Sequence, residues 1–440
     1  MRLVAGLLFA LSCLSVSAQV FEFTVLPSAS GINGAMEVRL DTDGTLIGNY
    51  DTASNPTGTR TKPGLFGSFL DTENVAVPVE VFGTVGSRSA GSISTQSSGN
   101  FTLEIDPALG KAYVTRFSLD FLNGSSLSIP SNISLRQNGF RTRSPSFFYL
   151  GGTIGLPIGN VTVGSLRGTQ MEPSPLGTCN TLSATQYSVA VPIPLVLSGS
   201  MLVMGSEIPL PPIPFEILLM GVVTVDGASA TVASQSSFTL EETRQPNQPI
   251  PPFDLALPTT GDPANVIMSL ILTEQTTYFQ GTNTMACSGP VLASGHVDAT
   301  VTFQDLAPGI YGPQDATMDI YDVATGDLVY RRGLLPAAGL HAIRLPHGTY
   351  DLALKESHWL RRRVRVTVGT TPVAATLSLL NGDVNGDNSV NIADYLIVRG
   401  AFGTSSDSPN YVAAADLDGN GSVNATDFLI LRKNFGRAGD

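Results

Sequence analysis

Apolar and polar residues alternate along most of the chain, which is the pattern of half-buried β-strands. In the clearest case, from Tyr113 to Phe121, nearly every second residue is apolar and the residues between are mostly polar or charged. Asn123-Gly124 follows as a turn signal. Residues 101–105 alternate in the same way. The pattern predicts a large β-sandwich or barrel-like region over 19–297, and no helix longer than about two turns before residue 381.

A second β region is predicted between residues 298 and 380. Short strand-like runs recur there and are separated by turn signals such as Thr325-Gly326-Asp327 and Pro346-His347-Gly348. Strands at a spacing of about 8–12 residues are typical of a small β-sandwich. The run from Leu345 to Ser357 resembles the strand–turn–strand core of the carboxypeptidase-regulatory-like sandwiches of secreted proteins. That resemblance implies a spacer or presentation module.

Composition agrees with several β-rich domains. The 440 residues exceed what one ordinary core accommodates. Charged residues make up 14% of the chain, which is rich in turn formers with 45 Gly and 29 Pro. The formal net charge is −12, and no basic patch of the nucleic-acid-binding type stands out, so no nucleic-acid partner is expected. The one basic cluster, Arg361 to Arg365, is interpreted as a solvated strand face.

The first 18 residues are expected to be a signal peptide. Arg2 precedes an apolar run from Leu3 to Leu14, and Val16-Ser17-Ala18 has the small residues of a cleavage site. A lipoprotein that uses Cys13 is the alternative. A later apolar run, Ile208 to Val225, is broken by four prolines and predicts no membrane span after signal removal. The chain is therefore expected to be secreted or displayed at the cell surface.

Two cysteines remain after signal removal, Cys179 and Cys287. In an oxidising compartment they would most simply form one disulfide. The chain-entropy model values a loop of that length at roughly 4–5 kcal/mol. Two separate buried thiols are the alternative. A catalytic cysteine is not expected, because it would need a base and His296 is the one histidine near either thiol in sequence.

The end of the chain holds a duplicated motif with a period of 33 residues. Each copy is a twelve-residue, Asp- and Asn-rich loop, Asp383 to Asp394 and Asp416 to Asp427. A helix-compatible apolar run follows each loop and ends in Phe-Gly, at Phe402-Gly403 and Phe435-Gly436.

The spacing of the loop residues predicts two calcium ions. Calcium takes six to eight oxygen ligands, and EF-hand-like loops supply them from positions 1, 3, 5, 7 and 12. Position 9 often acts through water. Position 8 is apolar in both loops, which predicts a short strand bridge between them. The predicted ligands, with a backbone carbonyl at position 7, are Asp383, Asn385, Asp387, Ser389 and Asp394 in the first loop and Asp416, Asp418, Asn420, Ser422 and Asp427 in the second.

Residues 381–440 resemble a type I dockerin. The resemblance rests on the Gly-Asp-x-Asn-x-Asp opening at Gly382 to Asp387, an Asp at position 12 and the duplicated loop–helix unit. It implies a small α-helical module that calcium folds and that docks on a cohesin-type domain of a scaffold or surface protein. In the family, loop positions 10 and 11 contribute to partner recognition. Here those positions are Ile392, Ala393, Ala425 and Thr426.

Three functions stay open for the whole chain. The first is a structural or carbohydrate-binding surface protein attached through its dockerin-like tail. The second is a polysaccharide-degrading glycoside hydrolase carried by the same tail, which needs only two suitably spaced carboxylates. Residues such as Asp120 and Glu216 cannot be selected for that role from sequence. In the third, the calcium module stabilises the C-terminal region and has no partner.

Overall fold

The computed structural model describes residues 18–171, 175–203, 206–306, 316–334 and 337–440. The predicted signal peptide, apart from Ala18, lies outside the described residues. The described chain is mainly β, and its two α-helices, α1 (Ile392–Ala401) and α2 (Ala425–Asn434), lie near the C-terminal end. The predicted fold class is therefore confirmed. Neither helix has the length and apolar character needed to cross a membrane.

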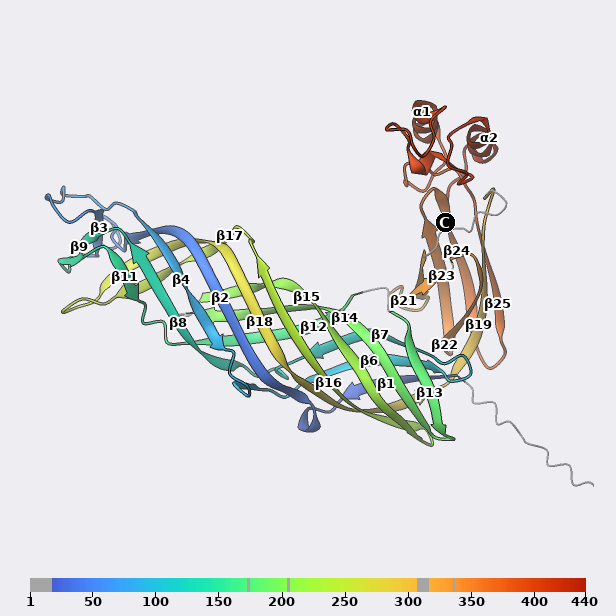
Figure 1. Cartoon of the computed structure of the whole chain (residues 1–440), viewed down its shortest axis with the longest axis horizontal. Helices are drawn as coiled ribbons and strands as arrows, with labels where there is room; N and C mark the ends of the chain where they lie inside the picture. Colours follow the sequence, from blue (N-terminus) through green and yellow to red (C-terminus); the bar gives the residue numbers. More distant parts are fainter. Residues whose placement is uncertain (1–17, 172–174, 204–205, 307–315, 335–336) are drawn as a thin grey trace, which may run out of the picture.

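The large N-terminal domain is built on one twisted sheet with a small three-stranded sheet at one end (Figure 1). A 3-10 turn, η1 (Pro27–Ala29), joins the first two strands. Fifteen strands make up the large sheet: β1 (Gln19–Val25), β2 (Gly31–Gly48), β4 (Val77–Ser87), β5 (Ile93–Ser94), β6 (Ser98–Asp106), β7 (Lys111–Asp120), β8 (Leu127–Gln137), β11 (Gly152–Gly155), β12 (Asn160–Gln170), β13 (Gly177–Ser183), β14 (Gln186–Val203), β15 (Ser206–Asp226), β16 (Ser229–Arg244), β17 (Gln248–Leu257) and β18 (Ala264–Leu292). The small sheet is formed by β3 (Arg60–Pro63), β9 (Phe140–Arg143) and β10 (Phe147–Tyr149).

The large sheet closes on itself and forms an elongated tube (Figure 1). The pairing of β13 with β7 completes one circuit of strands, β13-β14-β15-β16-β18-β1-β6-β7. The pairings of β14 with β12 and of β18 with β2 complete a second circuit, which shares β14, β15, β16 and β18 with the first. Closure leaves few free strand edges, because nearly every strand finds a partner on both sides.

The interior of the tube is apolar. Along β16 buried and exposed residues alternate from Ala230 to Phe238, as expected for a strand with one face inside. A chain of aromatic rings runs through Phe21, Phe23, Phe101 and Phe117, with ring centroids 5.4–5.6 Å apart. A cavity of about 80 Å³ remains inside the tube, and its lining is apolar apart from Thr42 and Gln275.

The predicted disulfide is wrong in this structure. Cys179 on β13 and Cys287 on β18 are both buried and both free. Three strands separate β13 from β18 in either direction around the first circuit of the tube. Because neighbouring strands lie about 4.8 Å apart, β13 and β18 lie on opposite sides of this circuit. A disulfide needs Cα atoms closer than about 7 Å. The alternative of two separate buried thiols is the observed arrangement.

The second domain is a small sandwich of two sheets. One sheet pairs β22-β19-β25 and the other pairs β21-β20-β23-β24. Its strands are β19 (Ser294–Phe303), β20 (Ala316–Asp322), β21 (Leu328–Leu334), β22 (Gly339–Pro346), β23 (Gly348–Glu356), β24 (Trp359–Val368) and β25 (Val373–Leu379). The predicted domain boundary at residue 297 falls inside β19, so the sandwich begins at Ser294.

A buried ion pair joins the sandwich to the tube. Arg332 of β21 contacts the carboxylate of Glu104 on β6, and both side chains are largely buried. The guanidinium of Arg332 also stacks 3.8 Å from the ring centroid of Tyr113. Arg116 of the tube lies over the ring of Tyr330 in the sandwich, at 5.5 Å. These contacts hold charged and aromatic groups in a fixed arrangement where the two domains meet.

Candidate calcium-binding module

Two capped helices fix the ends of the predicted calcium loops. At the start of α1 the side chain of Asn391 accepts a hydrogen bond from the N–H of Ala393, and Asp394 accepts one from the N–H of Asn391. Asn424 and Asp427 form the same capping box at α2. The asparagine at position 9 is thus the N-cap of its helix, a role in which Asn is strongly favoured. From sequence alone, position 9 is predicted to contact the ion through water.

Three carboxylates converge in the second loop. Oxygens of Asp416, Asp418 and Asp427 lie within 4.8 Å of one another, and all three residues are buried. The N–H of Leu417 donates to Asp427 Oδ1 at 2.7 Å, and the N–H of Gly421 donates to Asp416 Oδ2 at 2.7 Å. Buried carboxylates at this separation repel one another unless a cation lies among them. The set fits an oxygen-preferring divalent ion such as calcium.

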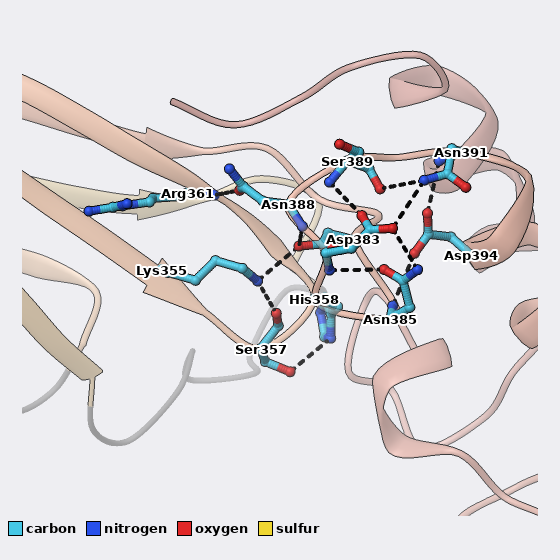
Figure 2. Close-up of polar contacts among 11 residues, drawn as sticks. Lys355, Ser357, His358, Arg361, Asp383, Asn385, Asn388, Ser389, Asn391 and Asp394 are labelled. Carbon is cyan, nitrogen blue, oxygen red and sulfur yellow. Dashed lines mark hydrogen bonds and ion pairs between the residues drawn. The ribbon is translucent and has the colours of Figure 1, made fainter.

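The first loop presents a buried oxygen that has no partner. Asp383 is fully buried, and its Oδ2 accepts the N–H of Asn388 at 3.0 Å (Figure 2). Its Oδ1 is buried without a hydrogen-bond partner. Asp394 is also fully buried and accepts the N–H groups of Asn385 and Asn391 at 3.0 and 2.8 Å. An orphaned buried carboxylate oxygen is costly, and a cation at this position would satisfy it.

The remaining predicted ligands lie on the loops between these buried carboxylates. In the first loop the amide of Asn385 donates to Asp387, and this bond is the largest effect that lowers the pKa of Asp387. Burial raises the pKa of Asp418 in the second loop. A cation would offset that effect because it favours the ionised carboxylate. The other predicted ligands lie between these positions: Ser389 in the first loop, and Asn420 and Ser422 in the second.

The predicted strand bridge between the two loops is not formed. Val390 at position 8 exchanges hydrogen bonds with the segment after α2, through Gly436 and Arg437. Val423 in the other loop exchanges them with Gly403 and Thr404, directly after α1. The segment at each Phe-Gly ending is therefore hydrogen-bonded to the loop of the other repeat. Both glycines have a φ of 82°, a conformation that Gly adopts without a steric penalty.

The two repeats pack against each other through equivalent residues. Tyr395 and Phe428 are 33 positions apart, and their rings meet edge to face with centroids 5.9 Å apart. On the outer surface, Leu396 of α1 and Leu429 of α2 are 55% and 56% exposed. Of the residues at positions 10 and 11, Ile392, Ala425 and Thr426 are exposed and Ala393 is half-buried. The positions predicted for partner recognition therefore lie at or near the surface.

The module shares its core and several polar contacts with the sandwich. Leu360 of β24 belongs to the apolar core of the module together with Val390, Val398 and Leu431. Asn381 donates to the carbonyls of Leu417 and Gln304 at 2.6 and 3.2 Å, which ties the second loop to the sandwich. None of these contacts leaves a local signal in sequence, since the partners lie 20 or more positions apart.

Comparison with known proteins identifies this part of the chain. Residues 381–436 match the family model of the type I dockerin domain. The C-terminal module is a type I dockerin. Dockerins of this type generally bind calcium. No curated protein matches the chain.

Part of the chain also has similar solved structures. Two are type II cohesin–X-dockerin complexes from Acetivibrio cellulolyticus, one with an N-terminal and one with a C-terminal interface mutation. Both matches have 21% identity and cover 33% of this chain and 97% of the other, with TM-scores of 0.29 and 0.28. At these values the likeness says nothing of what this chain binds.

Proposed function

We propose that this chain is an exported modular protein that its dockerin attaches, in a calcium-dependent way, to a cohesin-type domain of a scaffold or surface protein. The observation that carries the proposal is the duplicated loop–helix unit, which matches the type I dockerin family over residues 381–436. Exposed apolar residues at equivalent positions of the two helices, such as Leu396 and Leu429, support a protein partner.

The dockerin is proposed to hold two calcium ions, one in each loop. The buried carboxylates of the second loop support one site. The unpartnered Oδ1 of Asp383, with Asp394 buried in the same loop, supports the other. Bound calcium would supply the positive charge that these carboxylates lack and would fix the first turn of each helix through Asp394 and Asp427.

The tube is proposed to be non-catalytic, with a structural or polysaccharide-binding role. Glycoside hydrolysis needs two carboxylates facing one cleft. The linings of four cavities in the described part of the tube support this proposal, because they contain no aspartate or glutamate. Asp120 and Glu216, named as possible carboxylates for a hydrolase, line none of these cavities.

Capture of the full chain on immobilised type I and type II cohesin domains tests the docking function. We expect capture in calcium and release in a chelator. A double Ile392→Asp, Ala393→Asp variant should lose capture and still bind calcium. Leu340→Asp is the matched control, because Leu340 is 68% exposed on the sandwich and lies outside the dockerin. Failure of every cohesin to capture the chain in calcium, or equal capture in the chelator, contradicts the proposal.

Incubation of the full chain with a panel of polysaccharides tests the role of the tube. Depletion of the chain by an insoluble polysaccharide, without release of reducing sugar, supports binding. Release of reducing sugar would assign the hydrolase function instead. No depletion and no release would leave the structural role as the one supported.

A further inference from the structure

The first ligand of each calcium loop is held in the same way from inside the loop. In the first loop the N–H of Asn388 donates to Asp383 Oδ2 at 3.0 Å. In the second loop the N–H of Gly421, at the equivalent position 6, donates to Asp416 Oδ2 at 2.7 Å. This backbone hydrogen bond fixes one oxygen of each carboxylate, as the conformation of the loop requires.

A second donor to the same oxygen comes from outside each loop, and here the loops differ. The ammonium nitrogen of Lys355 lies 3.0 Å from Asp383 Oδ2 (Figure 2). The hydroxyl of Tyr411 donates to Asp416 Oδ2 at 2.7 Å. Lys355 belongs to β23 of the sandwich, whereas Tyr411 belongs to the dockerin itself. The donor of the first loop is therefore charged and comes from another domain.

Lys355 is itself held in place. Its ammonium also donates to the backbone carbonyl of Ser357 at 2.6 Å, and the side chain is 30% exposed. Asp383, in contrast, has no exposed side-chain surface. The lysine therefore reaches from the sandwich to a buried carboxylate whose other oxygen, Oδ1, has no hydrogen-bond partner.

We infer that Lys355 is a positioning residue for the first calcium site, so that the sandwich supplies the outer donor to the first ligand of this site, whereas in the second site Tyr411 of the dockerin supplies it. The inference rests on the proposed calcium sites. Lys355 is bonded to Oδ2 and leaves Oδ1 of Asp383 for the ion. Groups that hold a metal ligand in this way commonly change metal affinity about 10- to 100-fold when removed.

The charge of the lysine acts in the opposite direction. An ammonium near a bound cation repels it, and this repulsion weakens binding. The first loop, however, has three carboxylates, Asp383, Asp387 and Asp394, and with Lys355 it keeps an excess of negative charge that attracts calcium. We expect the orientation of a fully buried ligand to outweigh repulsion by a partly exposed ammonium. The sign of the affinity change on removing Lys355 decides between the two effects.

Calorimetric titration of the full chain with calcium tests the inference. Lys355→Met should weaken one of two binding constants about tenfold, and Lys355→Arg should restore most of it. Tyr411→Phe should weaken the other constant, so that the double variant is weakened at both sites. Lys433→Met is the matched control: Lys433 pairs with Asp305 at 2.9 Å and also joins dockerin to sandwich, but contacts no predicted calcium ligand.

The outcomes separate this inference from the proposed function. Two calcium ions with unchanged or tighter constants in Lys355→Met would overturn the role of Lys355 and leave the calcium sites intact. An equal change in Lys433→Met would mean that loosening the joint, and not the orientation of Asp383, weakens calcium binding. No calcium uptake by the unaltered chain would overturn the calcium sites and with them the role of Lys355.

Discussion

The side-chain Oδ1 of Asn388 accepts the backbone N–H of Arg361 at 2.7 Å, which joins the first calcium loop to strand β24 of the sandwich (Figure 2). Asn388 occupies position 6 of the loop with a φ of 67°. Glycine is usual at that position because of the sharp turn. The asparagine is therefore more than a tolerated substitute for glycine, because its amide oxygen holds the neighbouring domain.

Replacement of Asn388 tests this contact. Asn388→Ala should lower the free energy of unfolding of the calcium-loaded chain by about 2 kcal/mol, from one lost hydrogen bond and the cost of alanine in a left-handed conformation. Asn388→Gly loses the hydrogen bond alone and should cost about half as much. Hydrogen exchange of the Arg361 amide is the direct readout. Continued protection of that amide in both variants would show that the contact does not hold the joint.

Calcium removal should affect the sandwich as well as the dockerin, because Leu360 of β24 is part of the dockerin core. Each site contributes about 2.7 kcal/mol when free calcium is a hundred times its dissociation constant. Calorimetric unfolding with and without a chelator should show a lower transition temperature for the sandwich and dockerin and an unchanged one for the tube. A sandwich transition that ignores the chelator would contradict the shared core.

Both cysteines should react as free thiols only after unfolding. Burial raises the pKa of Cys179 to about 11 and that of Cys287 to about 12, so neither is a thiolate near neutral pH. A thiol reagent at pH 8 should label neither in the folded protein and both in denaturant without reductant. A chain that shows no reactive thiol under those denaturing conditions contains the disulfide after all.

Removal of Arg332 should destabilise the contact between tube and sandwich. The carboxylate of Glu104 would be left with little exposed surface and without its ion-pair partner, a situation that costs about 3–5 kcal/mol. Arg332→Ala should therefore lower the unfolding midpoint and increase proteolysis near residue 293. Arg136→Ala, which removes an exposed pair with Glu80, is the control and should have little effect. Equal effects of the two variants would rule out a special role for the buried pair.

The calcium loops and the β-strands could be predicted because their signals are local. The ligands of each loop lie within twelve consecutive residues, and alternation along β7 marks the buried face from Thr115 to Leu119. The same alternation does not hold at Tyr113, because the pairing of β6 with β7 shifts register after Thr115 and Val114 is the buried residue. Closure of the tube could not be predicted, because β13 pairs with β7 about 65 positions away and no local pattern names that partner. The disulfide prediction failed for the same reason, since it depended on which strands separate Cys179 from Cys287.

The contacts of the dockerin also divide into those that have a local sequence pattern and those that join residues far apart in sequence. The capping boxes at Asn391 and Asn424 have a recognisable sequence pattern and could have been found from it. The contacts of Lys355 with Asp383 and of Arg361 with Asn388 join residues 28 and 27 positions apart across a domain boundary. Such pairs depend on how two domains meet, which single-residue propensities do not encode.

Strands β1 and β18 pair side by side, with Val20 opposite Leu292, so the polypeptide enters and leaves the tube at the same end. The sandwich and dockerin continue from that end, and the small sheet of β3, β9 and β10 lies at the other (Figure 1). The loop after β3 carries Phe66 and Leu70, which are 91% and 72% exposed. When the dockerin is anchored, the length of the tube separates this exposed apolar loop from the attachment point (Figure 1).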